Sequence, residues 1–287
     1  MTSFRLGGPV DIYIEPANTE ELAALLRYLH ATNTAFLVLG NGSNILISDG
    51  GFRGVAVNIE KNFSALSVDK ETVTTGAGAR LSKFVDFCVS HGLAGTEMLA
   101  GIPGTIGGAV IMNAGAYGGE ISDHLVDVTL LRDDHILTLP VEECGFRYRN
   151  SDLRGDIILS ARFELPRGNE DQLRTRRKEL LLRRNAAQPV NYPNAGSIFK
   201  NPEGQFAARL IEECGLKGQT FGGARISELH ANFIINSGDS TSANIVDAIN
   251  HVRRVVFEKM KIELELEIQL IGFPEDVIVP LQGASQS

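Results

Sequence analysis

The sequence has 287 residues, 43% of them hydrophobic, and its 27 basic and 35 acidic residues give a formal net charge of −8. A chain of this length can bury a sizeable core and divide into about two domains, whereas its negative charge argues against chain-wide attraction to nucleic acid or anionic membranes. No apolar run approaches the length of about 18 residues that a membrane helix needs, and the N-terminus does not resemble a signal peptide. These features predict a cytoplasmic globular protein in which a local site meets any anionic ligand.

The first half of the chain alternates short apolar runs with helical patterns. Strands are predicted at residues 11–16, 35–40 and 55–60, and helices at 18–33 and 81–92. Asn18 or Thr19 is expected to cap the first helix, and Gly92 to end the second. More strands are predicted at 125–131, 135–140 and 156–165. This half is therefore expected to be α+β or α/β.

A long polar helix is predicted at about 169–186. Its basic residues are Arg174, Arg176, Arg177, Lys178, Arg183 and Arg184. A helix of this composition is most simply a solvated face, and the alternative is a basic rim for a phosphate-bearing ligand.

The turn-rich connection at 185–196 marks a domain boundary close to residue 185. The second domain is expected to contain helices at about 205–214 and 242–260, a compact segment at 222–238 and a strand at 264–273. The last six residues resemble a frayed tail. Cys88, Cys144 and Cys214 lie far apart without a CxxC pair, so we expect ordinary thiols and neither a disulfide framework nor a zinc site.

Two glycine-rich segments, residues 37–54 and 99–120, each adjoin apolar runs. Glycine permits positive φ and close backbone approach, so such loops can direct N–H groups at phosphate oxygens. Neither segment ends as a Walker A loop does, and neither fits the GxGxxG dinucleotide pattern. Composition alone leaves tight turns and a nucleotide site equally open.

Six motifs in order extend this interpretation. They are FRLGGPVDIYIEP, LGNGSNILISDGGFRGVAV, GIPGTIGGAVIMNAGAYGGEI, FRYRNS, NAGSIFKNP and LELEIQLIG, from about Phe4 to Gly272. Each motif is weak alone, but their order closely resembles that of the UDP-N-acetylenolpyruvoylglucosamine reductases, flavoenzymes of bacterial peptidoglycan synthesis. The resemblance implies an α+β fold with an FAD-binding region of the vanillyl-alcohol-oxidase and p-cresol-methylhydroxylase type. That region would span 1–184, as subdomains of about 1–60 and 61–184, followed by a substrate-binding domain at 185–272 and a C-terminal segment at 273–287.

The resemblance also implies the ligands. FAD would be the cofactor, NADPH would be the co-substrate, a UDP-sugar would be the substrate, and no metal would be needed. We expect FAD to be bound without a covalent link, because neither glycine-rich segment contains a histidine or cysteine that could tether it. The residues expected around FAD are Gly40, Asn41, Gly42, Ser43, Asn44, Gly101, Ile102, Pro103, Gly104, Thr105, Gly108, Asn113, Gly115 and Ala116. No nucleic-acid or membrane partner is expected, and the oligomeric state stays open.

The resemblance assigns three catalytic residues. Ser197, in the AGSxFKNP motif, would donate a proton to the substrate, and Arg149 and Glu267 would stabilise the negative charge that forms beside the substrate carboxylate. Serine is a weak acid, so a cation such as Lys200 or Arg149 is expected near it. Without the resemblance, all three residues have plainer interpretations. Arg149 would be a solvated strand charge, Glu267 would share the solvent face of a strand with Glu265, and Ser197 would be a turn residue or helix cap.

The segment between Arg149 and Ser197 is short, which resembles the compact subgroup that lacks an insertion bearing a substrate-closing tyrosine. Candidates for substrate contacts are Tyr117, Lys200 and Asn201, with Arg225 and His230 as weaker ones. The alternatives are another FAD oxidoreductase of the same fold and a non-catalytic nucleotide-sugar binding protein. A serine hydrolase is disfavoured because the GxSxG pattern is absent around Ser197.

Overall fold

The computed structural model describes residues 2–281 and divides the chain into two compact units. The larger unit consists of residues 11–41 and 54–184, and the smaller unit of residues 2–10, 42–53 and 185–281. Each unit has its own hydrophobic core. The chain therefore assembles each unit from segments that are distant in the sequence.

A three-stranded sheet in the order β1-β4-β2 opens the larger unit. Its strands are β1 (Val10–Ile14), β2 (Phe36–Leu39) and β4 (Phe52–Asn58), and β2 pairs with β4 in parallel. Helix α1 (Thr19–Ala31) connects β1 to β2, and the Asn18 side chain accepts a hydrogen bond from the Glu21 N–H at its start. Leu22, Leu26 and Leu29 recur at helical spacing and are buried in one core with β4, which explains why α1 packs on this sheet.

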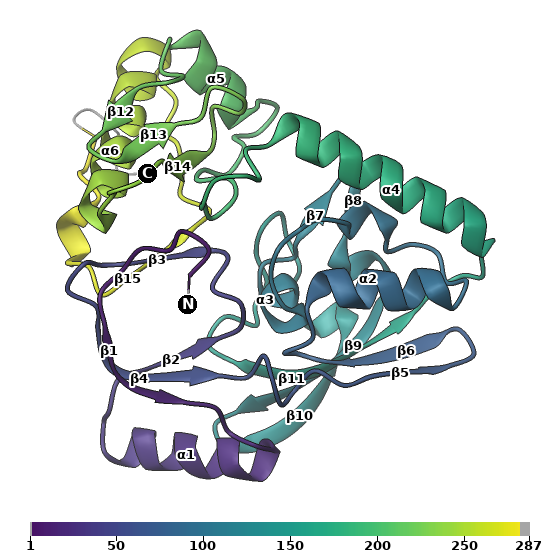
Figure 1. Cartoon of the computed structure of the whole chain (residues 1–287). Coiled ribbons are helices and arrows are strands. Elements are labelled where there is room, and N and C mark those ends of the chain that lie inside the picture. Colours follow the sequence, from purple (N-terminus) through teal and green to yellow (C-terminus); the bar gives the residue numbers. More distant parts are fainter. Residues whose placement is uncertain (1, 282–287) are drawn as a thin grey trace. The chain divides into compact units, whose positions relative to one another are not determined.

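The second sheet of the larger unit has five antiparallel strands in the order β10-β9-β11-β6-β5. They are β5 (Leu66–Asp69), β6 (Thr72–Gly76), β9 (Leu125–Arg132), β10 (His135–Pro140) and β11 (Ile157–Glu164). Helix α2 (Leu81–Ser90) packs on this sheet, with the Phe84 ring 4.8 Å from the Phe163 ring of β11. Helix α4 (Glu170–Ala187) runs beside α2 (Figure 1) and buries Leu173 and Leu180.

Short elements connect α2 to β9 and β10 to β11. They are η1 (Glu97–Leu99), α3 (Ile106–Ile111), β7 (Gly115–Ala116), β8 (Gly119–Glu120), η2 (Ile121–His124) and η3 (Val141–Glu143). Helix α3 and the hairpin of β7 and β8 both lie inside the second glycine-rich segment. This segment therefore contains regular secondary structure and is an integral part of the larger unit.

The smaller unit joins the beginning of the chain to its C-terminal third. Its elements are β3 (Ile45–Ile47), α5 (Ala207–Glu213), β12 (Thr220–Phe221), β13 (Ala224–Ile226), β14 (Ile234–Asn236), α6 (Ser242–Met260), β15 (Gln269–Ile271) and η4 (Glu275–Val277). Strands β12, β13 and β14 form an antiparallel sheet, and β15 pairs with β3 in parallel. Thr241 and Asn244 form a capping box that begins α6.

Most of the predicted elements are confirmed. Helices α1, α2, α4, α5 and α6 and strands β1, β2, β4, β9, β10 and β11 all lie where patterns predicted helix or strand. The pattern did not predict β3, the hairpin of β5 and β6, or helix α3. Cys88, Cys144 and Cys214 are free and buried, as expected for ordinary thiols, and burial raises the pKa of Cys88 to about 12 and that of Cys144 to about 11.

The strand predicted at 264–273 is wrong in its length, because only β15 is regular strand. The backbone bends at 267–268, where the Glu267 N–H donates to Ile198 O and the Gln269 N–H donates to Asn44 O. The pairing partner thus changes within the segment, which interrupts the alternation of faces. As a consequence Glu267 is half-buried, whereas Glu265 remains exposed as the alternation predicted.

The domain division expected at 1–184, 185–272 and 273–287 stays a prediction, and the expected frayed tail at 282–287 lies outside the described residues. No helix among residues 2–281 is long and apolar enough to cross a membrane.

Candidate active site

The two glycine-rich segments meet within the larger unit. A Cβ atom at Gly40 would lie 2.2 Å from Thr105 Oγ1, so only glycine permits this approach. Gly101 and Gly104 adopt φ values of +79° and +127°, which side chains disfavour. The Gly104 carbonyl accepts a hydrogen bond from the Leu81 N–H at 3.0 Å, which ties the loop to the start of α2. Segments predicted to share one ligand are therefore adjacent here.

Asn113 carries an acceptor with no protein partner. Its Oδ1 atom is buried and has no hydrogen bond within residues 2–281, although its Nδ2 donates to Glu120 Oε2 at 2.5 Å and to Arg147 O at 3.2 Å. Buried polar atoms are nearly always paired in native proteins. The unpaired oxygen thus suits a ligand that brings an N–H or O–H donor to the surface formed by Asn113 and its neighbours in the second glycine-rich segment.

Arg149 is held against the same segment, residues 113–120. Its guanidinium donates to Gly115 O at 2.7 Å and to Asn113 O at 3.4 Å, and its Nη1 lies 3.8 Å from Glu120 Oε1. The Arg149 side chain is only 18% exposed, whereas the Arg147 side chain is 54% exposed and pairs with Asp152. The plainer interpretation as a solvated strand charge therefore fits Arg147 and is wrong for Arg149.

The end of α4 adds positive charge beside Tyr117. The Arg183 guanidinium lies 5.3 Å from the Tyr117 ring centroid, and the Tyr117 hydroxyl donates to Leu180 O at 3.4 Å. The Arg184 stem lies against Gly101, where a Cβ atom would be 2.8 Å from Arg184 Cδ. Burial lowers the pKa of Arg184, and the charge of Arg149 also acts to lower it. Arg184 has no carboxylate partner within the described part of the chain.

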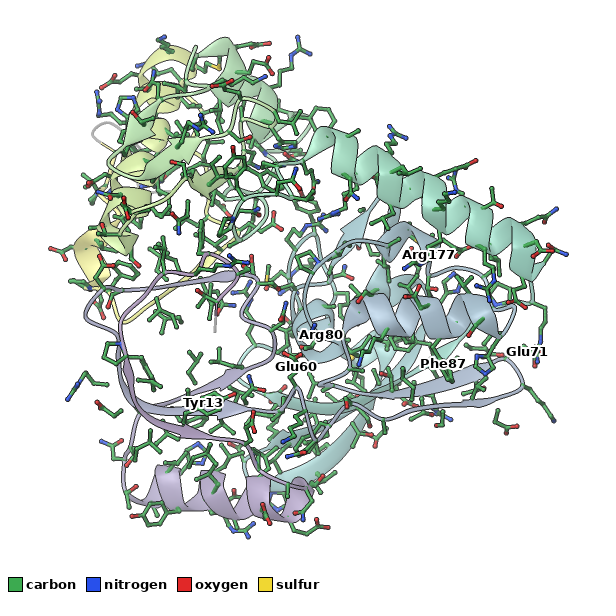
Figure 2. All side chains as sticks on the ribbon, in the orientation of Figure 1. Tyr13, Glu60, Glu71, Arg80, Phe87 and Arg177 are labelled. Atoms are coloured by element: carbon green, nitrogen blue, oxygen red, sulfur yellow. The ribbon has the colours of Figure 1, made fainter. Side chains whose placement is uncertain are left out.

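The rest of α4 shows which basic residues are already paired. A groove of about 740 Å³ lies between α2 and α4, with Arg174, Arg177 and Phe87 in its lining; Figure 2 labels Phe87 and Arg177. Arg177 pairs with Asp86 at 2.5 Å, and Arg174 pairs with Glu170 on its own helix. The solvated interpretation therefore suits the first turns of α4, and a basic rim suits its last turn.

In the smaller unit, the segment that follows Ser197 lies beside the segment that contains Glu267. The Glu267 N–H donates to Ile198 O at 2.8 Å, and the Lys200 N–H donates to Glu265 O at 2.9 Å. Ser197 and Glu267 are thereby fixed on neighbouring stretches of backbone. Lys200 Nζ forms an ion pair with Glu265 Oε2 at 2.9 Å, so its charge is largely committed to that carboxylate.

The start of the first glycine-rich segment is anchored beside Glu267. Asn44 Nδ2 donates to Glu267 O at 3.0 Å, and Asn44 O accepts from the Gln269 N–H at 3.0 Å. Gly42 has a φ of +61°, and its carbonyl accepts from the Ser3 N–H. Residues 42–44 therefore reach the segment of a predicted catalytic acid.

The remaining candidates contact other residues of the smaller unit. Asn201 Oδ1 accepts from the Ala207 N–H at 3.0 Å, at the start of α5. The Arg225 guanidinium lies 5.8 Å from the Tyr192 ring centroid and 3.9 Å from Glu228, and the His230 ring contacts the Phe233 ring at 4.7 Å. Arg149 belongs to the larger unit, and Ser197 and Glu267 belong to the smaller one. The structure thus joins two of the three predicted catalytic residues within one unit.

Comparison with known proteins defines the class first. An FAD binding domain model matches residues 10–137, which marks the chain as an FAD-binding flavoprotein. The model of the C-terminal domain of UDP-N-acetylenolpyruvoylglucosamine reductase matches residues 188–271.

Similarity over nearly the whole chain defines the family. The reductase of Lachnoclostridium phytofermentans is 44% identical over 278 residues, and that of Caldanaerobacter subterraneus subsp. tengcongensis is 42% identical over 274; each alignment covers 94% of this chain and 90% of the relative. The crystal structure of the enzyme from Thermus caldophilus matches with a TM-score of 0.81 and 36% identity, covering 94% of this chain and 95% of that chain. The protein belongs to the UDP-N-acetylenolpyruvoylglucosamine reductase family. The resemblance and the α+β fold class predicted from the motifs are confirmed.

FAD fits the residues of the larger unit. The isoalloxazine and ribityl groups of FAD carry N–H and O–H donors that suit the unpaired Asn113 oxygen, and its diphosphate suits the unpaired charge of Arg184. Gly108 leaves open space, because a Cβ atom there would meet its nearest neighbour only at 3.9 Å.

Proposed function

We propose that the protein catalyses the NADPH-driven, FAD-dependent reduction of the enolpyruvyl ether of UDP-N-acetylglucosamine-enolpyruvate to UDP-N-acetylmuramate, a cytoplasmic step of peptidoglycan synthesis. The observation that carries this proposal is the 42–44% identity to reductases of this name along 94% of the chain. The UDP-sugar is the small-molecule substrate.

The residues that would hold FAD come from both glycine-rich segments. They are Gly40, Asn41, Gly42, Ser43 and Asn44 from the first, and Gly101, Ile102, Pro103, Gly104, Thr105, Gly108, Asn113, Gly115 and Ala116 from the second. When bound, FAD would supply hydride chemistry, taking a hydride from NADPH and providing one to the double bond of the substrate. The close approach of Gly40 to Thr105 supports a shared role for the two segments.

Reduction of the enolpyruvyl double bond leaves negative charge on the carbon beside the carboxylate, and that charge must be stabilised and then quenched by a proton. Ser197 supplies this proton, and its oxygen then regains a proton from water. Arg149 pairs with the substrate carboxylate, and a protonated Glu267 donates a hydrogen bond to the developing charge. Lys200 pairs with Glu265, and a cation such as Lys200 or Arg149 would assist Ser197.

Three observations on the purified protein test this function. It should be yellow, acid precipitation should leave the flavin in the supernatant, and NADPH oxidation should depend on the enolpyruvyl substrate. A colourless protein would favour a non-catalytic nucleotide-sugar binding protein. Flavin turnover with oxygen that ignores the sugar nucleotide would favour another FAD oxidoreductase of this fold.

A further inference from the structure

Asn232 forms a two-point contact with the backbone beside Ser197. Its Oδ1 accepts from the Phe199 N–H at 2.9 Å, and its Nδ2 donates to Phe199 O at 2.8 Å. The Asn232 carbonyl also accepts from the Ile198 N–H at 2.9 Å. Asn232 is 3% exposed, so its amide is not shared with solvent.

The Asn232 amide acts here as a peptide group of a neighbouring strand would. Phe199 directs both of its main-chain polar groups at this amide, whereas Ile198 O and Lys200 N bond to the segment of Glu265 and Glu267. Successive residues of an extended chain point their polar groups to opposite edges. The backbone that follows Ser197 is therefore held at both edges, one by Asn232 and one by the segment of Glu267.

The residue before Ser197 has a contact within its own turn. Gly196 has a φ of +77°, and its N–H donates to Asn194 Oδ1 at 2.9 Å. Next to Ser197, the bonds to segments distant in sequence are therefore those of residues 198–200. Loss of the Asn232 amide would leave the polar groups of Phe199 buried without partners, and the local backbone would shift to find others.

We propose that Asn232 is a positioning residue that fixes the Ser197 hydroxyl relative to Glu267. This inference rests on the proposed function, in which Ser197 is the proton donor. Proton donation depends steeply on geometry, and a misplacement of about 1 Å can cost about 100-fold in rate. Asn232 would therefore affect the protonation step and leave FAD binding and reduction by NADPH unaffected.

The chain offers a matched control for a merely structural role. Asn250 on α6 makes the same kind of contact, with Nδ2 donating to Val277 O at 2.9 Å and Oδ1 accepting from the Val279 N–H at 3.0 Å. Asn232→Ala and Asn250→Ala each remove two side-chain hydrogen bonds to the backbone of the same unit. Of these two asparagines, only Asn232 contacts the backbone next to Ser197.

Rapid mixing of the FAD-loaded full chain separates the two half-reactions, and thermal unfolding of the same samples reports stability. For Asn232→Ala we expect flavin reduction by NADPH within about twofold of wild type and reoxidation by the enolpyruvyl substrate slowed about 10- to 100-fold. Asn250→Ala should lower the melting temperature but leave the ratio of the two rates unchanged. Equal slowing of both half-reactions in Asn232→Ala, or the same change of ratio in Asn250→Ala, would overturn the inference.

A double-mutant cycle adds a second test. If Asn232 acts through Ser197, then Ser197→Ala with Asn232→Ala should be no slower in reoxidation than Ser197→Ala alone. Multiplicative slowing would contradict this. Should Asn232→Ala not fold, Asn232→Asp keeps the shape and the acceptor, and it should slow reoxidation selectively; an unchanged ratio there would also refute positioning. A wild-type protein that binds FAD but is not reoxidised by the substrate would instead refute the proposed function.

Discussion

In the larger unit, the buried acceptor of Asn113 has no hydrogen-bond partner among residues 2–281, whereas in the smaller unit the backbone beside Ser197 and Glu267 is bonded by two asparagine side chains. Within residues 2–281 of the larger and smaller units, Asn113 Oδ1 has no hydrogen bond and Arg184 has no carboxylate partner, and Asn113, Tyr117 and Arg149 all adopt positive φ. In the smaller unit, Asn44 and Asn232 bond to the backbone on either side of the Ser197 and Glu267 segments. Strained, open residues suit a surface completed by a ligand, and closed networks suit groups that must stay in position.

The largest effect is expected from the closed network. Ser197→Ala should bind flavin and be reduced by NADPH near the wild-type rate, because neither step needs a proton donated to the sugar nucleotide. Reoxidation by substrate should slow by about 10²–10⁴-fold, as is typical for loss of a positioned proton donor. Flavin absorbance in rapid mixing reports both steps. Equal slowing of both would assign Ser197 to the shape of the flavin pocket.

The next largest effect should distinguish Glu267 from Glu265, which lie two residues apart in the same segment. Glu267→Gln should lower the rate of reoxidation by about 10²–10³-fold, because it removes an oriented group from a half-buried position. Glu265→Gln is the matched control, since its carboxylate is exposed and paired with Lys200, and it should change the rate by less than about threefold. Comparable losses in steady-state turnover from the two variants would contradict the assignment.

The role of the Asn113 oxygen in the larger unit can be tested through affinity for FAD. Asn113→Gly keeps the positive φ but removes the unpaired acceptor, so we expect FAD to bind about 10- to 100-fold more weakly. Asn33→Gly is the control, because Asn33 also has positive φ but lies exposed in the turn after α1. Titration of the apoprotein followed by flavin fluorescence measures both. Unchanged affinity in Asn113→Gly would mean that its oxygen does not face the cofactor.

A smaller effect is expected for the last turn of α4. Arg184→Gln should weaken binding of one diphosphate ligand about tenfold, because it removes a half-buried charge that has no carboxylate partner among residues 2–281. Arg176→Gln changes an exposed residue of the same helix and should have no such effect. Separate titrations with FAD, NADPH and the UDP-sugar identify the ligand. If Arg184→Gln binds all three ligands as tightly as wild type does, the whole of α4 is a solvated helix face.

The smallest effect concerns the thiols. The pKa of Cys88 is raised by burial to about 12, so the folded state keeps its proton while the unfolded state loses it above about pH 8.5. This contribution to stability is therefore present below pH 8.5 and declines as pH rises toward 12. We expect thiol reagents at pH 8 to label the three cysteines only after unfolding. Rapid labelling of Cys88 or Cys144 in the native protein would show that the larger unit opens readily, and rapid labelling of Cys214 would show the same for the smaller unit.

The sequence allowed prediction of elements with strong periodicity or clear caps, such as α1 and α6. Helix α3 was missed because glycine disfavours helix and tertiary packing overrides that preference. For the site, spacing alone placed none of the three catalytic candidates, and only the order of six motifs named Ser197, Arg149 and Glu267. The role of Asn232 could not be predicted from the sequence, because an asparagine between apolar residues looks the same whether it lies in a turn or bonds to a distant backbone segment. Its role depends on Phe199, which is distant in sequence.

The interleaving of the two units bears on how the chain is made. The smaller unit needs residues 2–10 and 42–53, which leave the ribosome early, and residues 185–281, which leave it last. Strand β3 must wait for β15, since Ile45 pairs with Gln269, and Phe4 must wait for the core that it joins in the C-terminal third. The larger unit can form meanwhile, whereas the segments around Ser197 and Glu267 gain their full framework only near the end of synthesis. A nascent chain would therefore complete the core of its larger unit before it completes the framework around Ser197 and Glu267.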